Sequence, residues 1–312
     1  MATDKESQEI SRRSFLKRTA FGGAGLVVAT DILEPNLLAA EKQKSANATM
    51  IGVPFDARER VRLGIIGVGG RGSSLLRDLL AVENVEVKAI CDLVPEKVEH
   101  AQKAVTSAGQ PEPAGFSKGE WDFKNLTQLD LDIVYIATTH PSHRDNAVAA
   151  LNAGKHVLVE KPLAVDAAGA REIGAAAASA NRFAGEAMWT KFLPKFDVIR
   201  QLLDDGALGE VRTVIADHGE FFTPDHRIYD PQLAGGPLLD LGTYPIALAH
   251  MVFGSFTSVV AQGQHAAKGL TGQISAMLSD ASGNQALLHT SILSDTPTAA
   301  VIGGRDATLS RS

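Results

Sequence analysis

Cysteine is almost absent from this sequence: Cys91 is the one cysteine among 312 residues. A single cysteine excludes an intramolecular disulfide and any metal site built from several thiolates. No apolar run reaches the roughly 18 residues that a membrane-spanning helix needs, which excludes a multi-span membrane protein. No Asp, Glu and His cluster has metal-ligand spacing, so we expect no metal.

The sequence also has no excess of basic residues: it contains 30 Lys and Arg and 36 Asp and Glu, which gives a net charge of −6. This balance argues against a nucleic-acid partner. The remaining composition is that of an ordinary globular protein, with 45% hydrophobic and 21% charged residues and a mean hydropathy of +0.01. The length predicts roughly two domains of about 150 residues each.

The N-terminal segment has the pattern of an export signal. Arg12 and Arg13, followed by Phe15-Leu16-Lys17, precede a short Gly/Ala-rich apolar run. This arrangement resembles the twin-arginine motif, and the alternative is a chance basic helix. The resemblance implies a signal peptide over residues 1–40, a linker over 41–60, transport by the twin-arginine export machinery, and a periplasmic or otherwise exported location.

A glycine-rich turn between a strand and a helix predicts a dinucleotide site. The apolar run 61–66 reads as a buried strand, and residues 73–82 have helical apolar spacing. Between them lies the G-x-G-x-x-G pattern, whose expected cofactor-binding residues are Gly67, Gly69, Gly70, Arg71 and Gly72. In this context the glycines allow a tight turn and a close approach of the cofactor's phosphates to a helix N-terminus.

The acid that completes this fingerprint is Asp92, 20 residues beyond Gly72 and just after a second strand, 85–90. Its carboxylate would bind the ribose hydroxyls and repel a 2′-phosphate, which favours NAD over NADP. Lys97 is the only nearby cation, and NADP stays possible.

Strand and helix patterns continue to alternate through the first half of the chain. We expect strands at 131–137 and 155–159 and helices at 144–153 and 166–180, the last capped by Asp166. The intervening residues 109–130 show no clear periodicity. The alternation predicts a doubly wound parallel sheet over residues 61–180, with the loops after its strands converging on one crevice.

Two further motifs resemble the glucose–fructose oxidoreductase/inositol dehydrogenase/MocA (Gfo/Idh/MocA) family. They are the His140-Pro141-Ser142-His143 loop and Glu160-Lys161-Pro162. The segments 186–194 and 235–245 resemble its dihydrodiol and xylose dehydrogenase branch. The resemblance implies an α/β fold whose Rossmann domain is followed by a C-terminal α+β domain, residues 181–312, with an open, mostly antiparallel sheet.

The C-terminal pattern agrees with that expectation. After a helical segment at 194–205 come alternating strand-like segments at 211–218, 258–264, 273–278, 285–291 and 298–302. The family usually continues for several more strands, so we expect this domain to be incomplete. The resemblance also implies a homo-oligomer, either a dimer or a tetramer.

Oxidation of an alcohol requires a base for the hydroxyl proton. Tyr244 is the candidate acid/base, with Lys161 as its electrostatic partner, since a nearby cation favours a phenolate. Asp240 is the candidate anchor for either the substrate or Lys161. It lies four residues before Tyr244 and would share its face on a helix, although Pro245 interrupts that helix. Each residue also has a purely structural explanation. Tyr244 would be a core tyrosine, Lys161 a surface lysine and Asp240 a helix cap.

The resemblance further implies cofactor contacts from Thr138, His143, Glu160, Lys161 and Trp189. It implies an NAD(P)-dependent oxidoreductase acting on a secondary hydroxyl or carbonyl of a sugar, polyol or cyclic diol. An exported NAD-dependent glycosidase is the second hypothesis, because the leader and residues 109–124 resemble such enzymes of the same superfamily. A non-catalytic sugar or nucleotide sensor is the third.

Overall fold

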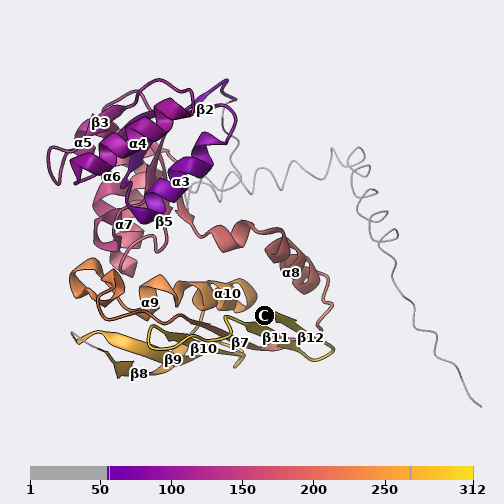
Figure 1. Ribbon diagram of the computed structural model, residues 1–312. Coiled ribbons are helices and arrows are strands. Elements are labelled where there is room, and N and C mark those ends of the chain that lie inside the picture. Colours follow the sequence, from indigo (N-terminus) through magenta and orange to yellow (C-terminus); the bar gives the residue numbers. More distant parts are fainter. Residues whose placement is uncertain (1–54, 56, 267–268, 312) are drawn as a thin grey trace, which may run out of the picture. The chain divides into compact units, whose positions relative to one another are not determined.

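The computed structural model describes residues 55, 57–266 and 269–311, which all belong to one compact unit (Figure 1). The expected signal peptide, residues 1–40, and most of the expected linker lie outside the described residues. Within the described ranges, no helix is long and apolar enough to cross a membrane.

The first half forms a parallel sheet of six strands in the order β3-β2-β1-β4-β5-β6. Its strands are β1 (Val61–Ile66), β2 (Val85–Cys91), β3 (Ala114–Phe116), β4 (Ile133–Ile136), β5 (His156–Glu160) and β6 (Ala184–Ala187). The order reverses at β1, which has β2 on one side and β4 on the other. This is the doubly wound arrangement that the alternation predicted, and ligands bind such sheets at the reversal point.

Helices cover both faces of this sheet (Figure 1). They are α3 (Gly70–Leu80), α4 (Pro95–Ser107), α5 (Phe123–Thr127), α6 (His143–Asn152) and α7 (Ala167–Ala180). Leu76 of α3 and Val98 of α4 are buried in one core cluster, and Leu151 of α6 is buried in another. Asp166 caps α7 as predicted, because its side chain accepts the Gly169 N–H at 2.8 Å.

The first half of the chain differs from the sequence prediction at two places. The segment 109–130 contains β3 and α5, although it shows no periodicity. The edge strand β3 has three residues and pairs only with β2, so it is too short to show an alternating pattern. The sheet also continues past residue 180, since β6 pairs with β5 in parallel.

The second half is built on a six-stranded sheet in the order β12-β11-β7-β10-β9-β8. The strands are β7 (Val211–Gly219), β8 (Ser258–His265), β9 (Thr271–Ser279), β10 (Gln285–Ser291), β11 (Ala300–Gly304) and β12 (Thr308–Arg311). Only the β7–β10 pair is parallel, so the predicted open, mostly antiparallel sheet is confirmed.

One face of the second sheet packs against helices, which Figure 1 shows above it. These are α8 (Pro194–Asp204), α9 (Pro237–Asp240) and α10 (Thr243–Phe253). Leu248 and Ala249 of α10 share a core cluster with Val214 of β7 and Leu288 of β10. Burial of this apolar face is what stabilises the sheet against the helices.

Candidate active site

The glycine turn after β1 has the geometry that a dinucleotide requires. Gly67 has φ +87°, which L side chains rarely adopt. A Cβ on Gly72 would lie 1.9 Å from the carbonyl oxygen of Gly67, so no side chain fits there. No side chain caps α3 at Gly69, which leaves its first N–H groups free to bind phosphate oxygens. These residues fit the diphosphate of a dinucleotide.

Asp92 fastens this turn to the end of β2. One carboxylate oxygen, Oδ2, accepts the N–H of Val68 at 2.9 Å, and Oδ1 accepts the N–H of Val94 at 3.0 Å. Each oxygen retains a further lone pair. The acid therefore lies at the turn, where the fingerprint requires it, and its ribose contact stays a prediction.

Glu160, at the end of β5, is joined to the glycine turn by Arg71. The Nε of Arg71 donates to Oε1 of Glu160 at 3.0 Å, and the buried Tyr135 hydroxyl donates to the same oxygen at 3.1 Å. Burial, followed by the charge of Glu160, raises the pKa of Tyr135. This network places the loop that carries Lys161 next to the turn.

His143 lies between the loops that follow β4 and β5, and its contact with the cofactor stays a prediction. Its side chain is fully buried, with Nδ1 2.8 Å from the carbonyl oxygen of Pro162 and Nε2 3.1 Å from that of Thr138. Burial lowers the pKa of His143. Both ring nitrogens thus face backbone carbonyls of the loops after β4 and β5, and the neutral ring donates its single N–H to one of them. The Thr138 hydroxyl accepts a hydrogen bond from Asn146 at 3.2 Å.

Lys161 and Asp240 form a close ion pair. The Nζ of Lys161 lies 2.6 Å from Oδ1 of Asp240 and 2.7 Å from its carbonyl oxygen. The two side chains are only 13% and 14% exposed. Burial by itself would raise the pKa of Asp240, but Lys161 and then Arg227 hold it below its ordinary value. The carboxylate is therefore ionised and anchors the ammonium.

Tyr244 lies beside this pair. The Lys161 Nζ is 5.5 Å from the centre of its ring, and the indole Nε1 of Trp189 donates to its hydroxyl at 3.2 Å. Trp189 is 48% exposed, so this side of the site is open. The structure thus brings together all three residues that were predicted to be catalytic.

The route by which they meet differs from the prediction. Asp240 ends α9 and Tyr244 lies in the first turn of α10, with the bend at Leu241 and Gly242 between them. The two side chains are therefore not on one face of a single helix. Pro245 does not break α10, because a proline in the first turn lacks only an N–H that would have no partner in the helix.

Two histidines complete the site. His218 of β7 packs its ring against that of Tyr244, with centroids 5.1 Å apart, and burial lowers its pKa. His140 precedes His143 and is buried, which lowers its pKa to about 4. His218 could not be predicted from the sequence, because a histidine in a strand carries no motif. Within the described ranges, no group of three His, Cys, Asp or Glu residues could hold a metal ion.

Family models match both halves of the chain. Residues 61–187 match the oxidoreductase family model with an NAD-binding Rossmann fold, and residues 196–310 match the GFO/IDH/MocA C-terminal domain. These matches cover well over half of the sequence. The chain belongs to the Gfo/Idh/MocA oxidoreductase family.

Curated relatives share part of this sequence. A glycosyl hydrolase family 109 protein of Saccharopolyspora erythraea is 47% identical over 165 residues, which are 52% of this chain and 36% of that protein. A trans-1,2-dihydrobenzene-1,2-diol dehydrogenase of Xenopus laevis is 38% identical over 177 residues, 56% of this chain and 54% of that enzyme. The matched region thus spans about half or less of these relatives' length.

Solved structures have the same architecture. An aldose–aldose oxidoreductase of Caulobacter crescentus, complexed with glycerol, superposes with a TM-score of 0.73 at 26% identity, covering 80% of this chain and 76% of that chain. A 3-ketoreductase of Actinomadura kijaniata, in complex with NADP and TDP-benzene, gives 0.70 at 26% identity, with coverages of 79% and 74%.

Proposed function

We propose that this protein is an NAD(P)-dependent oxidoreductase that acts on a secondary hydroxyl or carbonyl of a sugar, polyol or cyclic diol. The observation that carries the proposal is the cluster of Lys161, Asp240 and Tyr244 next to a glycine turn that fits a dinucleotide. The named activities of the solved 3-ketoreductase and aldose–aldose oxidoreductase support the same class of substrate.

The residues divide the chemistry as follows. A nicotinamide coenzyme held at the glycine turn would supply hydride transfer to or from the substrate carbon. The hydroxyl of Tyr244 transfers the proton to or from the substrate oxygen, while the Trp189 N–H holds the phenol oxygen in place. Two oxygens of Asp240, its backbone carbonyl oxygen and Oδ1, accept hydrogen bonds from the Lys161 ammonium. An ammonium has three N–H donors, so one is left to polarise the substrate oxygen.

The test is a purification followed by identification of the co-purifying nucleotide and a screen of polyols, aldoses and cyclic diols at 340 nm. We expect a bound pyridine nucleotide and a change in absorbance with at least one substrate. The variant Tyr244→Phe should keep the nucleotide and lose the absorbance change. Binding of a nucleotide without any turnover across the screen would favour a sensor, and binding of neither coenzyme would refute the proposal.

An NAD-dependent glycosidase is the second candidate. It is favoured by the 47% identity to a glycosyl hydrolase family 109 protein over 165 residues. Such an enzyme would release a chromogenic aglycone from a nitrophenyl glycoside with no net conversion of the coenzyme. Release of the aglycone at a rate proportional to the enzyme concentration, while the absorbance of the reduced coenzyme stays constant, would establish the glycosidase function in place of the oxidoreductase function.

We further propose that the protein is exported in folded form by the twin-arginine machinery. This rests on the Arg12-Arg13 pair and the short apolar run that follows it. The full chain, expressed in a bacterium with this pathway, should be recovered from the periplasm, and the Arg12→Lys/Arg13→Lys variant should stay in the cytoplasm. Equal periplasmic recovery of both chains would contradict the proposal.

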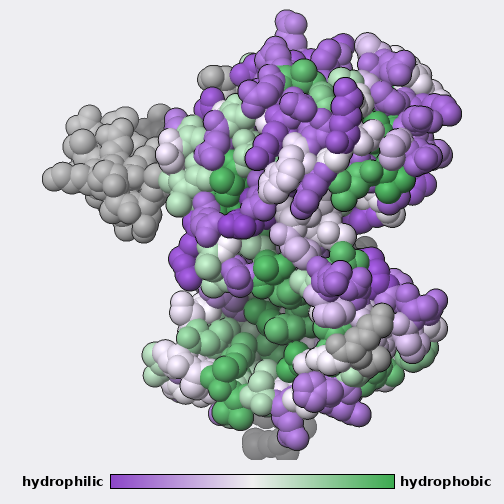
Figure 2. Space-filling view, turned by 90° about the vertical axis from the view of Figure 1, so that its left-hand side faces the viewer, coloured by the Kyte–Doolittle hydropathy of each residue, from purple (hydrophilic) through white to green (hydrophobic). Residues whose placement is uncertain are grey.

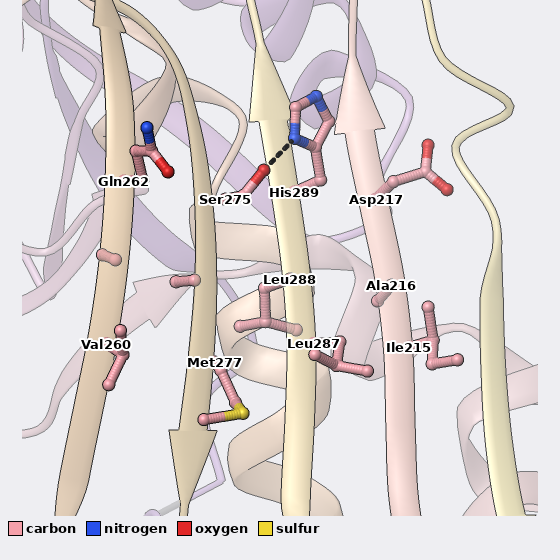
Figure 3. Close-up of a pocket in the computed structure, with 12 residues that line it drawn as sticks. Ile215, Ala216, Asp217, Val260, Gln262, Ser275, Met277, Leu287, Leu288 and His289 are labelled. Atoms are coloured by element: carbon pink, nitrogen blue, oxygen red, sulfur yellow. Dashed lines mark hydrogen bonds between the residues drawn. The ribbon is translucent and has the colours of Figure 1, made fainter.

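The second sheet also supports the expected homo-oligomer. On its outward face, strand register aligns Val260, Met277, Leu287 and Ile215 in one apolar row across four strands (Figure 3). Val260 is 65% exposed, Ile215 48% and Leu287 41%. Figure 2 shows hydrophobic residues gathered on the lower part of the molecule, which contains this sheet.

A polar row runs beside it, through residues 262, 275, 289 and 217, in which Ser275 hydrogen-bonds His289 at 2.9 Å (Figure 3). An apolar row with a polar border is typical of a protein interface. We propose a second copy of the chain as its partner. Sedimentation equilibrium should show a dimer or tetramer, and Leu287→Asp should shift it to monomer, whereas Arg212→Ala should not. A parent chain that is monomeric at micromolar concentration would refute this.

A further inference from the structure

His218 extends the helix-covered face of β7 to the end of the strand. Because side chains alternate along a strand, His218 lies on the same face as Val214 and Ala216. Those two residues are buried in the core cluster that they share with Leu248 of α10. An apolar side chain would continue this pattern. The chain instead places an imidazole at a position where packing alone favours a hydrophobic residue.

The ring of His218 is partly buried and packs against the ring of Tyr244. The two ring centroids lie 5.1 Å apart, with an angle of 46° between the ring planes. Within the part of the chain that the structure describes, neither ring nitrogen of His218 has a hydrogen-bond partner. A partly buried polar group without a partner is unfavourable, so a ligand that hydrogen-bonds to this ring gains binding energy.

The protonation state of His218 suits a hydroxyl ligand. Burial lowers the pKa of His218, and the positive charge of Lys161 acts in the same direction. The carboxylates of Glu220, Asp217 and Asp240 oppose this shift of the pKa without cancelling it. The imidazole is therefore neutral at pH 7, with one N–H donor and one acceptor nitrogen. A hydroxyl also both donates and accepts, so it can pair with either nitrogen.

His218 lies next to the groups that contact the reacting oxygen in the proposed reaction. These groups are the hydroxyl of Tyr244 and the ammonium of Lys161. The Lys161 Nζ is 5.5 Å from the centre of the Tyr244 ring, and the centre of the His218 ring is 5.1 Å from it. A substrate whose reacting oxygen lies at the phenol hydroxyl therefore has its next carbon atoms within the span of these contacts.

We propose that His218 hydrogen-bonds a second substrate hydroxyl, on the carbon next to the reacting carbon, so that the site selects vicinal diols over simple secondary alcohols. The inference rests on the proposed function and deepens it, because it assigns the residue that determines substrate specificity. A site that is built to hydrogen-bond a hydroxyl rejects an analogue without it, since the polar group of the protein then stays unpaired.

Steady-state kinetics at 340 nm with trans-1,2-cyclohexanediol and cyclohexanol test this inference, because the two compounds differ by a single hydroxyl. The parent chain should oxidise the diol with a kcat/KM at least about 100-fold above that for cyclohexanol. His218→Phe keeps an aromatic ring against Tyr244 and should lower this ratio by about tenfold or more, with the loss in the diol. His218→Gln retains a donor and an acceptor and should keep the ratio within about fivefold of the parent's. The control His100→Phe, at an exposed position of α4, should leave the ratio unchanged.

Three outcomes would overturn the inference. An equal fall of kcat/KM for both compounds in His218→Phe would show that the ring acts only through its packing against Tyr244. Equal kcat/KM values for the two compounds in the parent chain would show that no second hydroxyl is recognised. Turnover of another compound in the screen, but of neither of these two, would refute a site for vicinal diols and leave the proposed oxidoreductase intact. Absence of binding by either pyridine coenzyme would instead refute the proposed function itself.

Discussion

The Nζ of Lys161 lies within 2.7 Å of two oxygens of Asp240, a residue 79 positions further along the chain. Lys161 follows the last residue of β5 in the parallel sheet, and Asp240 ends α9 beside the second sheet. This contact joins the two halves of the chain at the site. It also uses two N–H groups of the ammonium, which orients the third.

The ion pair predicts a strong dependence of stability on its carboxylate. Asp240→Asn leaves a mostly buried ammonium without its counter-charge and should lower the free energy of unfolding by about 3 kcal/mol. Urea unfolding of Asp240→Asn, Lys161→Met and the double variant measures the coupling between the two side chains. The double variant should lose less free energy of unfolding than the sum of the losses in the two single variants. Strict additivity would show that the charges do not interact.

Proton transfer should depend on the hydroxyl of Tyr244. Tyr244→Phe should lower kcat by about 10²- to 10⁴-fold while coenzyme affinity stays within about twofold. Trp189→Phe removes only one hydrogen bond to that hydroxyl and should lower kcat by about fivefold, equivalent to roughly 1 kcal/mol. Steady-state kinetics at 340 nm and calorimetry separate the two effects. A Tyr244→Phe enzyme with the parent's kcat would exclude this residue as the acid/base.

The two glycines at the start of α3 should respond oppositely to the same substitution. Gly72→Ala places a Cβ 1.9 Å from the Gly67 carbonyl oxygen, so the turn must shift and Tm should fall by several degrees. Gly70→Ala meets nothing within 4 Å and should leave Tm unchanged or slightly raised, because alanine restricts the unfolded chain. Thermal unfolding of the two apoproteins makes the comparison. Equal Tm values would mean that the turn has more space than the structure shows.

Stability should fall in mildly acidic solution because of His140. Burial lowers its pKa from 6.5 to about 4, so between these values the unfolded chain binds a proton that the folded chain does not. This contribution is therefore complete above pH 6.5 and is lost as the pH falls toward 4. The loss is on the order of 3 kcal/mol. Urea unfolding at several pH values measures this loss. The free energy of unfolding should fall less steeply with decreasing pH in His140→Leu than in the parent protein, and equal slopes in both proteins would contradict the prediction.

The fold was predictable wherever a pattern is local. Strand β1, the glycine turn and α3 follow one another without interruption, so their residues specify both structure and site. The cap of α7 was likewise predictable, because Asp166 bonds an N–H only three residues away. The short strand β3 was not predictable, since its three residues are held by pairing with β2 rather than by their own pattern.

The sequence by itself determined the class of this protein: an alternating α/β half with a dinucleotide turn, a β-rich half, and a lysine and a tyrosine suited to alcohol chemistry. Only the tertiary structure decided how these groups meet. It placed Tyr244 on a second helix, buried His143 between two backbone carbonyls, and brought His218 and Lys97 to the site. The physical reason is that such contacts depend on the packing of elements far apart in the chain, which no local periodicity records.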